Sequence, residues 1–290
     1  MPEGAVGLLD DGWRMGNVIA FIPASGGVGS STLAAAVAVR AAAAGRTVVA
    51  VDLDHLAGSL DVLFGLEQER GWRWRELTEV AGVVDGRGLA DELPVSCGVP
   101  VLSGRSGASW ASPGVGAAGG GGDRDGEVGG MAAGWLDTLP DVVAGLADAH
   151  ALTVLDLPRD PAVLDAVGLL VDAVVVVVGT QVPQLAAASA VVSGVGGLLH
   201  HLRDVARSWD DEPLLPIEPW VVLRGQRVEA DLEDLVMDEL DVPLIATVRD
   251  DRRTVAEASE GLPPGARGRG EVVRAADELL LRLTDQAIAA

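Results

Sequence analysis

Short apolar segments alternate with longer helix-like segments along almost the whole chain. The segments that predict strands are residues 17–23, 47–52, 98–103, 151–156, 173–178, 220–223 and 243–248. The segments that predict helices are residues 31–44, 131–149, 162–170, 183–209, 229–240 and two closing helices, the second over 271–290. This alternation is typical of an α/β fold with a doubly wound, mostly parallel sheet and helices on both faces. The valines of 173–178 fit a strand buried on both faces.

One long polar interval interrupts this alternation. Residues 106–130 are rich in Gly, Ser and Ala, include Gly119 to Gly122, and show almost no apolar periodicity. Such a composition predicts a flexible loop or linker. Because the strands on both sides fit one sheet, we interpret it as an insertion in a single domain that spans residues 17–290. Residues 1–16 form an N-terminal tail before this domain.

Charge and composition limit the classes of ligand and compartment. The formal net charge is -22, and all 21 basic residues are arginines, because the sequence contains no lysine. An acidic surface repels phosphate backbones, so we expect no nucleic-acid partner. The longest apolar run, 173–179, is far below the ~20 residues of a membrane span, so no direct membrane insertion is expected. The N-terminus lacks the basic and apolar regions of a signal peptide, and a single cysteine fits a reducing compartment, which together predict a cytoplasmic protein.

A glycine-rich turn joins the first predicted strand to the first predicted helix. Its residues are Gly26, Gly27, Val28, Gly29, Ser30, Ser31 and Thr32. Glycines let backbone N–H groups approach an anion closely, and the N-terminus of the helix adds a favourable dipole. The hydroxyls of Ser31 and Thr32 lie in the first helical turn, where a phosphate-binding loop holds phosphate and Mg²⁺. The turn is therefore a candidate phosphate site.

Three aspartates follow strands that are expected to end near this turn. Asp52 and Asp54 come at the end of the strand 47–52, and Asp156 ends the strand 151–156. An apolar strand that ends in Asp is typical of a Walker B motif, whose carboxylate faces Mg²⁺. Ligands of doubly wound sheets bind beyond the carboxyl ends of the strands. We therefore expect the three carboxylates and the turn to converge on one site.

Taken together, these segments resemble the deviant Walker A family that includes MinD, ParA and the pilus-localisation proteins CpaE and TadZ. The loop of that family reads Lys-Gly-Gly-x-Gly-Lys-Ser/Thr-Thr, and the matching residues here are Gly26, Gly27, Gly29, Ser31 and Thr32. The sequence DLPR at 156–159 is close to the CpaE-like variant. The resemblance implies that Ser31, Asp52 and Asp156 hold the Mg²⁺ of ATP, and that Asp54 positions the attacking water in an active member.

Three positions depart from the family pattern. Ser25 and Ser30 stand where the family has its two loop lysines, and the chain has no other lysine to replace them. Leu223 and Arg224 stand where the family has Asn-Arg, so the arginine remains a candidate cofactor-binding residue while the amide that contacts adenine is lost. The resemblance therefore implies that ATP and Mg²⁺ bind weakly or not at all, and that little or no ATP is hydrolysed.

The role of such a protein follows from the same resemblance. It implies a positioning or scaffolding role for pilus or secretion machinery, or in septum placement as in actinobacterial septum-site proteins. The expected partners are proteins of those machineries, with a homodimer as a further option. Partner proteins, and not lipid contacts, would recruit the chain to the membrane or the pole.

Two alternatives remain open on the residues alone. An active ATPase could use Arg159 or Arg224 in place of the lysines, although a planar guanidinium does not fit the compact space of a loop lysine. A dinucleotide-binding oxidoreductase would explain the glycine turn and an acid about 20 residues further on, but that class uses Tyr and Lys, which the chain lacks.

The arginine-flanked Trp72 and Trp74 predict either core packing or a partner-binding patch.

Overall fold

The computed structural model describes residues 16–55, 58, 60–77, 80–104, 125–207 and 217–289. A sheet of eight strands, in the order β3-β4-β2-β5-β1-β6-β7-β8, runs through this part of the chain. The strands are β1 (Asn17–Pro23), β2 (Val48–Asp52), β3 (Val95–Ser96), β4 (Val99–Leu102), β5 (Leu152–Asp156), β6 (Ala173–Gly179), β7 (Trp220–Gly225) and β8 (Leu244–Arg249). Neighbouring strands are parallel, except that β3 is antiparallel to β4. The expected doubly wound, mostly parallel sheet is confirmed.

The strand order places β5 between β2 and β1. In the dinucleotide-binding fold with order 3-2-1-4-5-6, the second strand instead lies beside the first. Here Asp156 at the end of β5 is opposite Asp52 of β2 on one side and Phe21 of β1 on the other. The sheet thus brings together the ends of the three strands predicted to carry the site, and its order argues against the oxidoreductase alternative.

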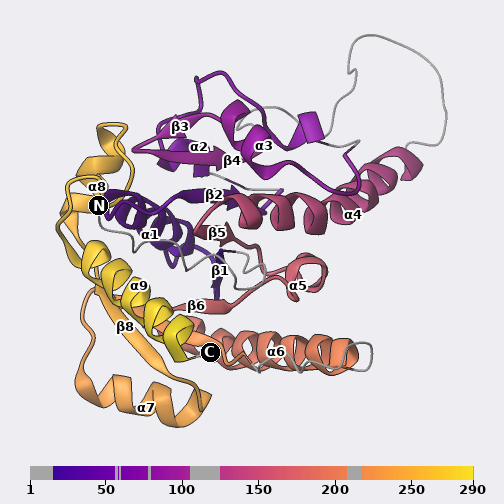
Figure 1. Ribbon diagram of the computed structural model, residues 1–290. Coiled ribbons are helices and arrows are strands. Elements are labelled where there is room, and N and C mark those ends of the chain that lie inside the picture. Colours follow the sequence, from indigo (N-terminus) through magenta and orange to yellow (C-terminus); the bar gives the residue numbers. More distant parts are fainter. Residues whose placement is uncertain are drawn as a thin grey trace, which may run out of the picture.

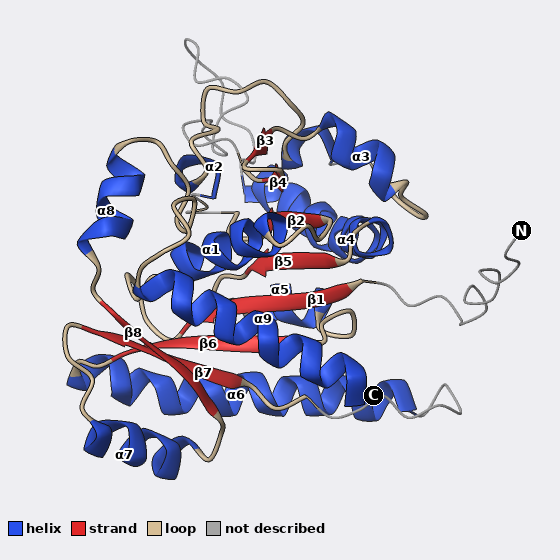
Figure 2. Cartoon of the chain, turned by 60° about the vertical axis from the view of Figure 1, so that its left-hand side comes forward, coloured by secondary structure: helices blue, strands red, loops and turns tan. Residues whose placement is uncertain are grey.

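Helices cover both faces of the sheet, as Figures 1 and 2 show. They are α1 (Ser30–Ala43), α2 (Leu60–Leu63), α3 (Gly86–Glu92), α4 (Asp125–Ala149), α5 (Pro161–Val167), α6 (Val182–Arg207), α7 (Ala230–Leu240), α8 (Arg252–Ser259) and α9 (Glu271–Ala289), with a 3-10 turn η1 (Trp74–Leu77). Alternate residues of a strand point to opposite faces. Ile19 and Phe21 of β1 therefore join the core shared with α1 and α9, while Val18 and Ala20 join the core shared with α4, α5 and α6.

The structure differs from the sequence-based expectation between β2 and α4. The pattern does not predict the short elements α2, η1, α3 and β3, because each is shorter than the stretch of about 11–18 residues over which apolar periodicity is recognised. α4 begins at Asp125 and not at residue 131, so residues 125–130 of the predicted loop are helical. Glycines disfavour a helix by about 1 kcal/mol each, which is why this stretch predicts a loop. The remainder of that loop and residues 1–15 lie outside the described residues.

β3 and β4 form a two-residue hairpin at one edge of the sheet. Its turn residues are Cys97, with a φ of 51°, and Gly98, with a φ of 78°. Positive φ at both central residues is the geometry of a type I′ turn, in which Asn or Asp is the usual first residue. Cysteine gives no such signal, so the sequence does not reveal the hairpin. The turn exposes Cys97, the single cysteine of the sequence.

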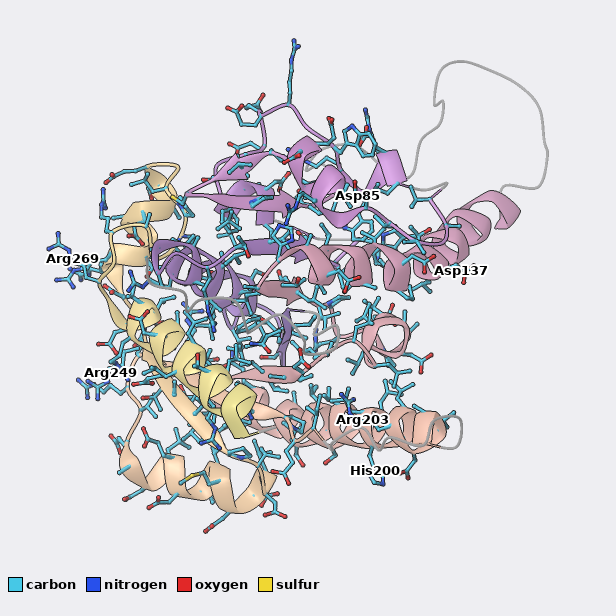
Figure 3. The ribbon with its side chains drawn as sticks, in the orientation of Figure 1. Asp85, Asp137, His200, Arg203, Arg249 and Arg269 are labelled. Carbon is cyan, nitrogen blue, oxygen red and sulfur yellow. The ribbon has the colours of Figure 1, made fainter. Side chains whose placement is uncertain are left out.

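α6 is both long and apolar. Among the described residues, its stretch Val182–Ala206 is the one helix long and apolar enough to cross a membrane. An 18-residue window of this stretch has a mean hydropathy of 1.5, and 22% of that window is buried. A search for uninterrupted apolar runs misses it, because Ser, Gln and His interrupt the run. α6 packs on the sheet through one face, which includes Ala188 and Leu199. Figure 3 shows Arg203 on the side of α6 that faces the sheet and His200 on the opposite side.

Candidate functional site

The glycine-rich turn lies between β1 and α1, at the carboxyl end of β1. Gly27 and Gly29 have positive φ angles of 74° and 86°, which glycine adopts without a steric penalty. Gly29 is also the N-cap of α1, and it provides no side-chain hydrogen bond to the first turn of this helix. The N–H groups at the start of α1 can therefore be satisfied by an external acceptor, which is how helix N-termini bind anions.

Two serines with buried hydroxyls occupy the turn and its junction with α1. The hydroxyls of Ser25 and Ser30 have no hydrogen-bond partner within the described part of the chain. Ser30 is 4% exposed, so water is largely excluded from it as well. A buried hydroxyl without a partner is destabilising by about 1–3 kcal/mol, and a ligand or an ordered water is its usual partner. Ser25 and Ser30 occupy the two positions at which the deviant Walker A family, which the sequence resembles, has lysine.

Asp52 and Asp156 lie opposite each other at the ends of β2 and β5. Both are almost fully buried, at 2% and 4% exposed. The carboxylate of Asp52 accepts hydrogen bonds from the backbone N–H groups of Asp54 and Leu60, each with an N···O distance of 3.0 Å. The carboxylate of Asp156 accepts a hydrogen bond from the hydroxyl of Ser31. The ends of β2 and β5 thus meet the first turn of α1, as expected.

Burial raises the pKa of both carboxyls. The pKa of Asp52 rises to about 7, because loss of hydration outweighs its two backbone hydrogen bonds. The pKa of Asp156 lies well above its usual value, chiefly because of burial and then because of the charge of Asp52 beside it. Two adjacent buried carboxylates are therefore difficult to ionise together unless a cation is present.

These residues fit Mg²⁺. This ion prefers oxygen ligands, uses one or two carboxylates, and completes its shell with waters and substrate phosphates. Asp52, Asp156 and the hydroxyl of Ser31 offer such a set. No cluster of three or more His, Cys, Asp or Glu side chains suited to a metal occurs among the described residues, so waters and phosphate oxygens would have to complete the shell here.

An aromatic cluster lies behind the loop that follows β2. The ring centroid of His55 is 4.8 Å from that of Trp135 in α4, and Trp135 meets Trp74 edge to face at 5.9 Å. The indole Nε1 of Trp74 donates to the backbone carbonyl of Asp52 at 2.6 Å. Trp74 is therefore part of the core, whereas Trp72 is 40% exposed. The sequence gives no hint of this contact, because Trp135 lies far along the chain from His55.

Two adjoining hollows open around the turn. The first, of about 720 Å³, is lined by Gly26 to Thr32 together with Asp54, His55, Arg159 and Arg224. The second, of about 770 Å³, lies between the turn and the β8–α8 loop and includes Arg224, Arg249 and Asp250 in its lining. Asp52 and Asp156 are buried behind the turn and line neither hollow. All the predicted site residues are thus close together, with the carboxylates of Asp52 and Asp156 below the surface.

Arg224 extends from the end of β7 onto the turn. Its Nη1 donates to the carbonyl of Gly27 at 3.1 Å, and its Nη2 forms an ion pair with Asp250 at 3.3 Å. A Cβ on Gly29 would lie 3.0 Å from Nη1, so the guanidinium packs directly against the turn. The structure therefore places Arg224 in the candidate site, as predicted, and adds Asp250, which the sequence analysis did not single out.

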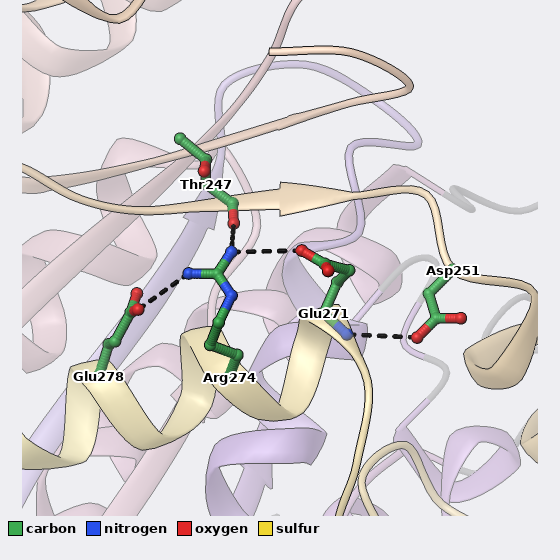
Figure 4. Close-up of polar contacts among 5 residues, drawn as sticks. All are labelled: Thr247, Asp251, Glu271, Arg274 and Glu278. Carbon is green, nitrogen blue, oxygen red and sulfur yellow. Dashed lines mark hydrogen bonds and ion pairs between the residues drawn. The ribbon is translucent and has the colours of Figure 1, made fainter. Parts of the chain in front are cut away.

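α9 braces the loop that carries Asp250. Arg274 of α9 donates to the carbonyl of Thr247 in β8 at 2.6 Å and pairs with Glu271 at 3.2 Å (Figure 4). Asp251 accepts a hydrogen bond from the N–H of Glu271 at 3.2 Å. These contacts connect β8, the loop and the first turn of α9, so Asp250 is presented from a fixed backbone.

A glycine-rich turn between β1 and α1, with acidic ends on β2 and β5, is the arrangement of a P-loop NTPase-like α/β fold of the MinD/ParA kind. Three solved structures share this fold at 14%, 16% and 17% identity. The first is a ParA family ATPase from Chlorobium tepidum, with a TM-score of 0.66 over 92% of this chain and 98% of that chain. The second is the septum site-determining protein MinD complexed with Mg-ADP from Pyrococcus horikoshii, with a TM-score of 0.63 over 94% of this chain and 98% of that chain. The third is the MinC:MinD cell division protein complex of Aquifex aeolicus, with a TM-score of 0.58 over 91% of this chain and 96% of that chain.

Similarity in sequence covers a smaller part of the chain. No protein-family model matches it. The uncharacterized protein Rv3660c of Mycobacterium tuberculosis strain H37Rv is 39% identical over 104 residues, which are 36% of this chain and 28% of that protein. The chain thus spans less than a third of the length of this curated relative, because the match covers 28% of it. The similarity to solved structures shows the fold of this chain.

Proposed function

We propose that this chain is a MinD/ParA-like positioning or scaffolding protein that binds ATP and Mg²⁺ weakly or not at all and hydrolyses little or no ATP. The observation that carries the proposal is the presence of Ser25 and Ser30 at the two lysine positions of the loop. The hydroxyl of Ser30 is buried and has no partner in the described residues. The sequence contains no lysine that could reach it.

The physical reason concerns charge in the transition state. Phosphoryl transfer depends on electrostatic stabilisation of the phosphate oxygens, and a cation placed there contributes about 10³–10⁵ in rate. Glycine N–H groups and a Mg²⁺ held by Ser31, Asp52 and Asp156 favour phosphate binding but do not replace that cation. Asp54 would position an attacking water only in an active enzyme. The site therefore favours weak binding without turnover.

A protein that does not turn over ATP acts through the partners that it binds. MinD of Aquifex aeolicus forms a complex with MinC, and the motifs of this chain resemble those of CpaE, TadZ and septum-site proteins. We infer that its partners are proteins of pilus, secretion or division machinery, and that they recruit it from the cytoplasm to the membrane or the pole. The net charge of -22 favours this route over contact with anionic lipid. A homodimer is compatible with the same role.

The test combines phosphate release from Mg²⁺–ATP with titration calorimetry. The unmodified chain should release no phosphate above the buffer rate and should bind ATP weakly. Ser30→Lys should bind ATP at least about tenfold more tightly, because a charged hydrogen bond contributes about 1.5–3 kcal/mol. Ser25→Lys is the matched control, since the lysine of that position acts across a dimer in the family. Steady hydrolysis by the unmodified chain that is lost in Asp54→Ala would refute the proposal.

An arginine-assisted ATPase is the second candidate. It is favoured by Arg159 and Arg224, which both line the hollow around the turn. In that case ATP hydrolysis should be measurable and should fall on substitution of the assisting arginine by Met. Arginine at such a site is a weaker substitute, because its planar fork does not enter the space of a loop lysine.

A further inference from the structure

Arg224 lies at the boundary between the two hollows and lines both of them. One of its guanidinium nitrogens contacts the carbonyl of Gly27 in the turn, and the other contacts the carboxylate of Asp250. The cation therefore lies on the phosphate loop but belongs to a different strand. Arg159 is exposed and lines only the first hollow.

We propose that Arg224 binds a phosphate group from outside the loop, without entering the space of a loop lysine, and that Asp250 pairs with Arg224 until a phosphate group displaces it. The ligand class is a polyphosphate or the phosphate chain of a nucleotide. This inference rests on the proposed function, because it identifies how a loop without lysine retains phosphate binding. It adds a residue that recognises phosphate and a carboxylate that competes with phosphate for that residue.

The ion pair is suited to exchange. The side chains of Arg224 and Asp250 are 35% and 48% exposed, and one pair of oppositely charged, partly exposed groups is weakly held. A phosphate carries more charge than a carboxylate and matches the fork of a guanidinium with two parallel hydrogen bonds. A phosphate bound at the turn would therefore compete effectively with Asp250 for Nη2, while Nη1 remains close to Gly27.

The backbone around both residues is fixed, so the exchange needs only side-chain movement. Arg224 is paired with Gly179 of β6 and with Val248 of β8. Its carbonyl accepts from the N–H of Thr180 at 3.1 Å, and the N–H of Asp250 donates to the carbonyl of the residue after Arg224 at 3.2 Å. Strand pairing thus holds the backbone of Arg224 at the same place with or without the carboxylate partner of its side chain.

Titration calorimetry with sodium tripolyphosphate tests the inference on the full chain. Arg224→Met should weaken binding by about tenfold or more, since it removes a charged hydrogen bond to phosphate. Asp250→Asn should tighten binding by about two- to fivefold, since it removes a competing carboxylate. Arg227→Met is the matched control: this arginine lies in the loop that follows β7, is exposed, and lines neither hollow. It should bind as the unmodified chain does.

Three outcomes would overturn the inference. These are unchanged binding in Arg224→Met, no tightening in Asp250→Asn, and an absence of tripolyphosphate binding by both the unmodified chain and Asp250→Asn at millimolar concentration. If Arg224→Met does not fold, Asp250→Asn still decides, because loss of folding cannot tighten binding. None of these outcomes involves hydrolysis, so the proposed function would survive them. Steady ATP hydrolysis would refute the proposed function and leave the measured role of Arg224 intact.

Discussion

At the scale of single residues, the environment of two aspartates defines what the site can do. Asp52 and Asp156 lie opposite each other at strand ends and are almost fully buried, so their charge is difficult to accommodate in the folded chain. A group whose charged form is disfavoured by folding makes stability depend on pH. The direction of that dependence follows from the raised pKa.

Stability should fall as the pH rises between about 4 and 7. The pKa of Asp52 is 3.8 for an unperturbed carboxyl and about 7 in the folded chain. Between these values the folded state holds more protons, so the free energy of unfolding is greatest below the window and decreases through it. Urea unfolding at pH 5.5 and pH 8 measures the difference, and Mg²⁺ should recover part of it at pH 8 if it binds between the carboxylates.

Asp52→Asn is the control for this dependence. With 43 acidic residues and a net charge of -22, general repulsion also grows with pH. The asparagine variant retains a side-chain oxygen to accept a backbone hydrogen bond but cannot ionise. Its stability should therefore change less between the two pH values. An equal change in both proteins would assign the effect to the overall charge.

At the scale of secondary-structure elements, the sequence predicts the long strands and helices and misses the region between β2 and β4. Strands such as β6 are continuous apolar runs, and α1 is an Ala-rich run that ends before Gly45, so local composition determines them. This region also contains contacts that join its irregular segments, such as the buried guanidinium of Arg73, which donates to the carbonyls of Leu66 and Glu69. No local pattern records such contacts.

The contact between η1 and β2 should contribute measurably to stability. Trp74→Phe removes the indole that donates to the buried carbonyl of Asp52, so it should lower the free energy of unfolding by about 1–3 kcal/mol. Trp72→Phe is the matched control, because this side chain is 40% exposed and should change stability by less than about 0.5 kcal/mol. Urea denaturation compares the two. Equal stabilities would mean that the Asp52 carbonyl does not depend on Trp74.

The candidate site could be predicted at the level of its residues but not of its pairings. The glycine turn, Ser31 and the aspartates are recognised from motifs on adjacent strand ends, because parallel strands deliver their carboxyl ends to one edge. The partnership of Arg224 with Asp250 depends on β7 lying beside β8 and on the brace from α9, which are properties of the assembled sheet. Likewise, the clustering of Trp135 with His55 joins segments separated by the long loop.

At the scale of the whole molecule, α6 is the feature that a membrane experiment would probe. We expect the purified chain not to float with vesicles of anionic lipid, because its net charge is -22 and α6 packs on the sheet through Ala188 and Leu199. Val205→Asp, on the exposed side of α6, is the control and should behave in the same way. Flotation of the unmodified chain that is lost in Val205→Asp would show that α6 enters lipid and that recruitment does not require partner proteins.

The β3–β4 turn has a practical consequence for following this protein. Cys97 is the single thiol of the sequence and is exposed, so a maleimide dye can attach at one known point. The strands β4, β2 and β5 lie between that edge and β1, which leads into the glycine-rich turn. A label there is separated from the loop by the width of several strands. The proposed recruitment of the chain can therefore be followed with one small fluorophore, without fusing a second protein to either terminus.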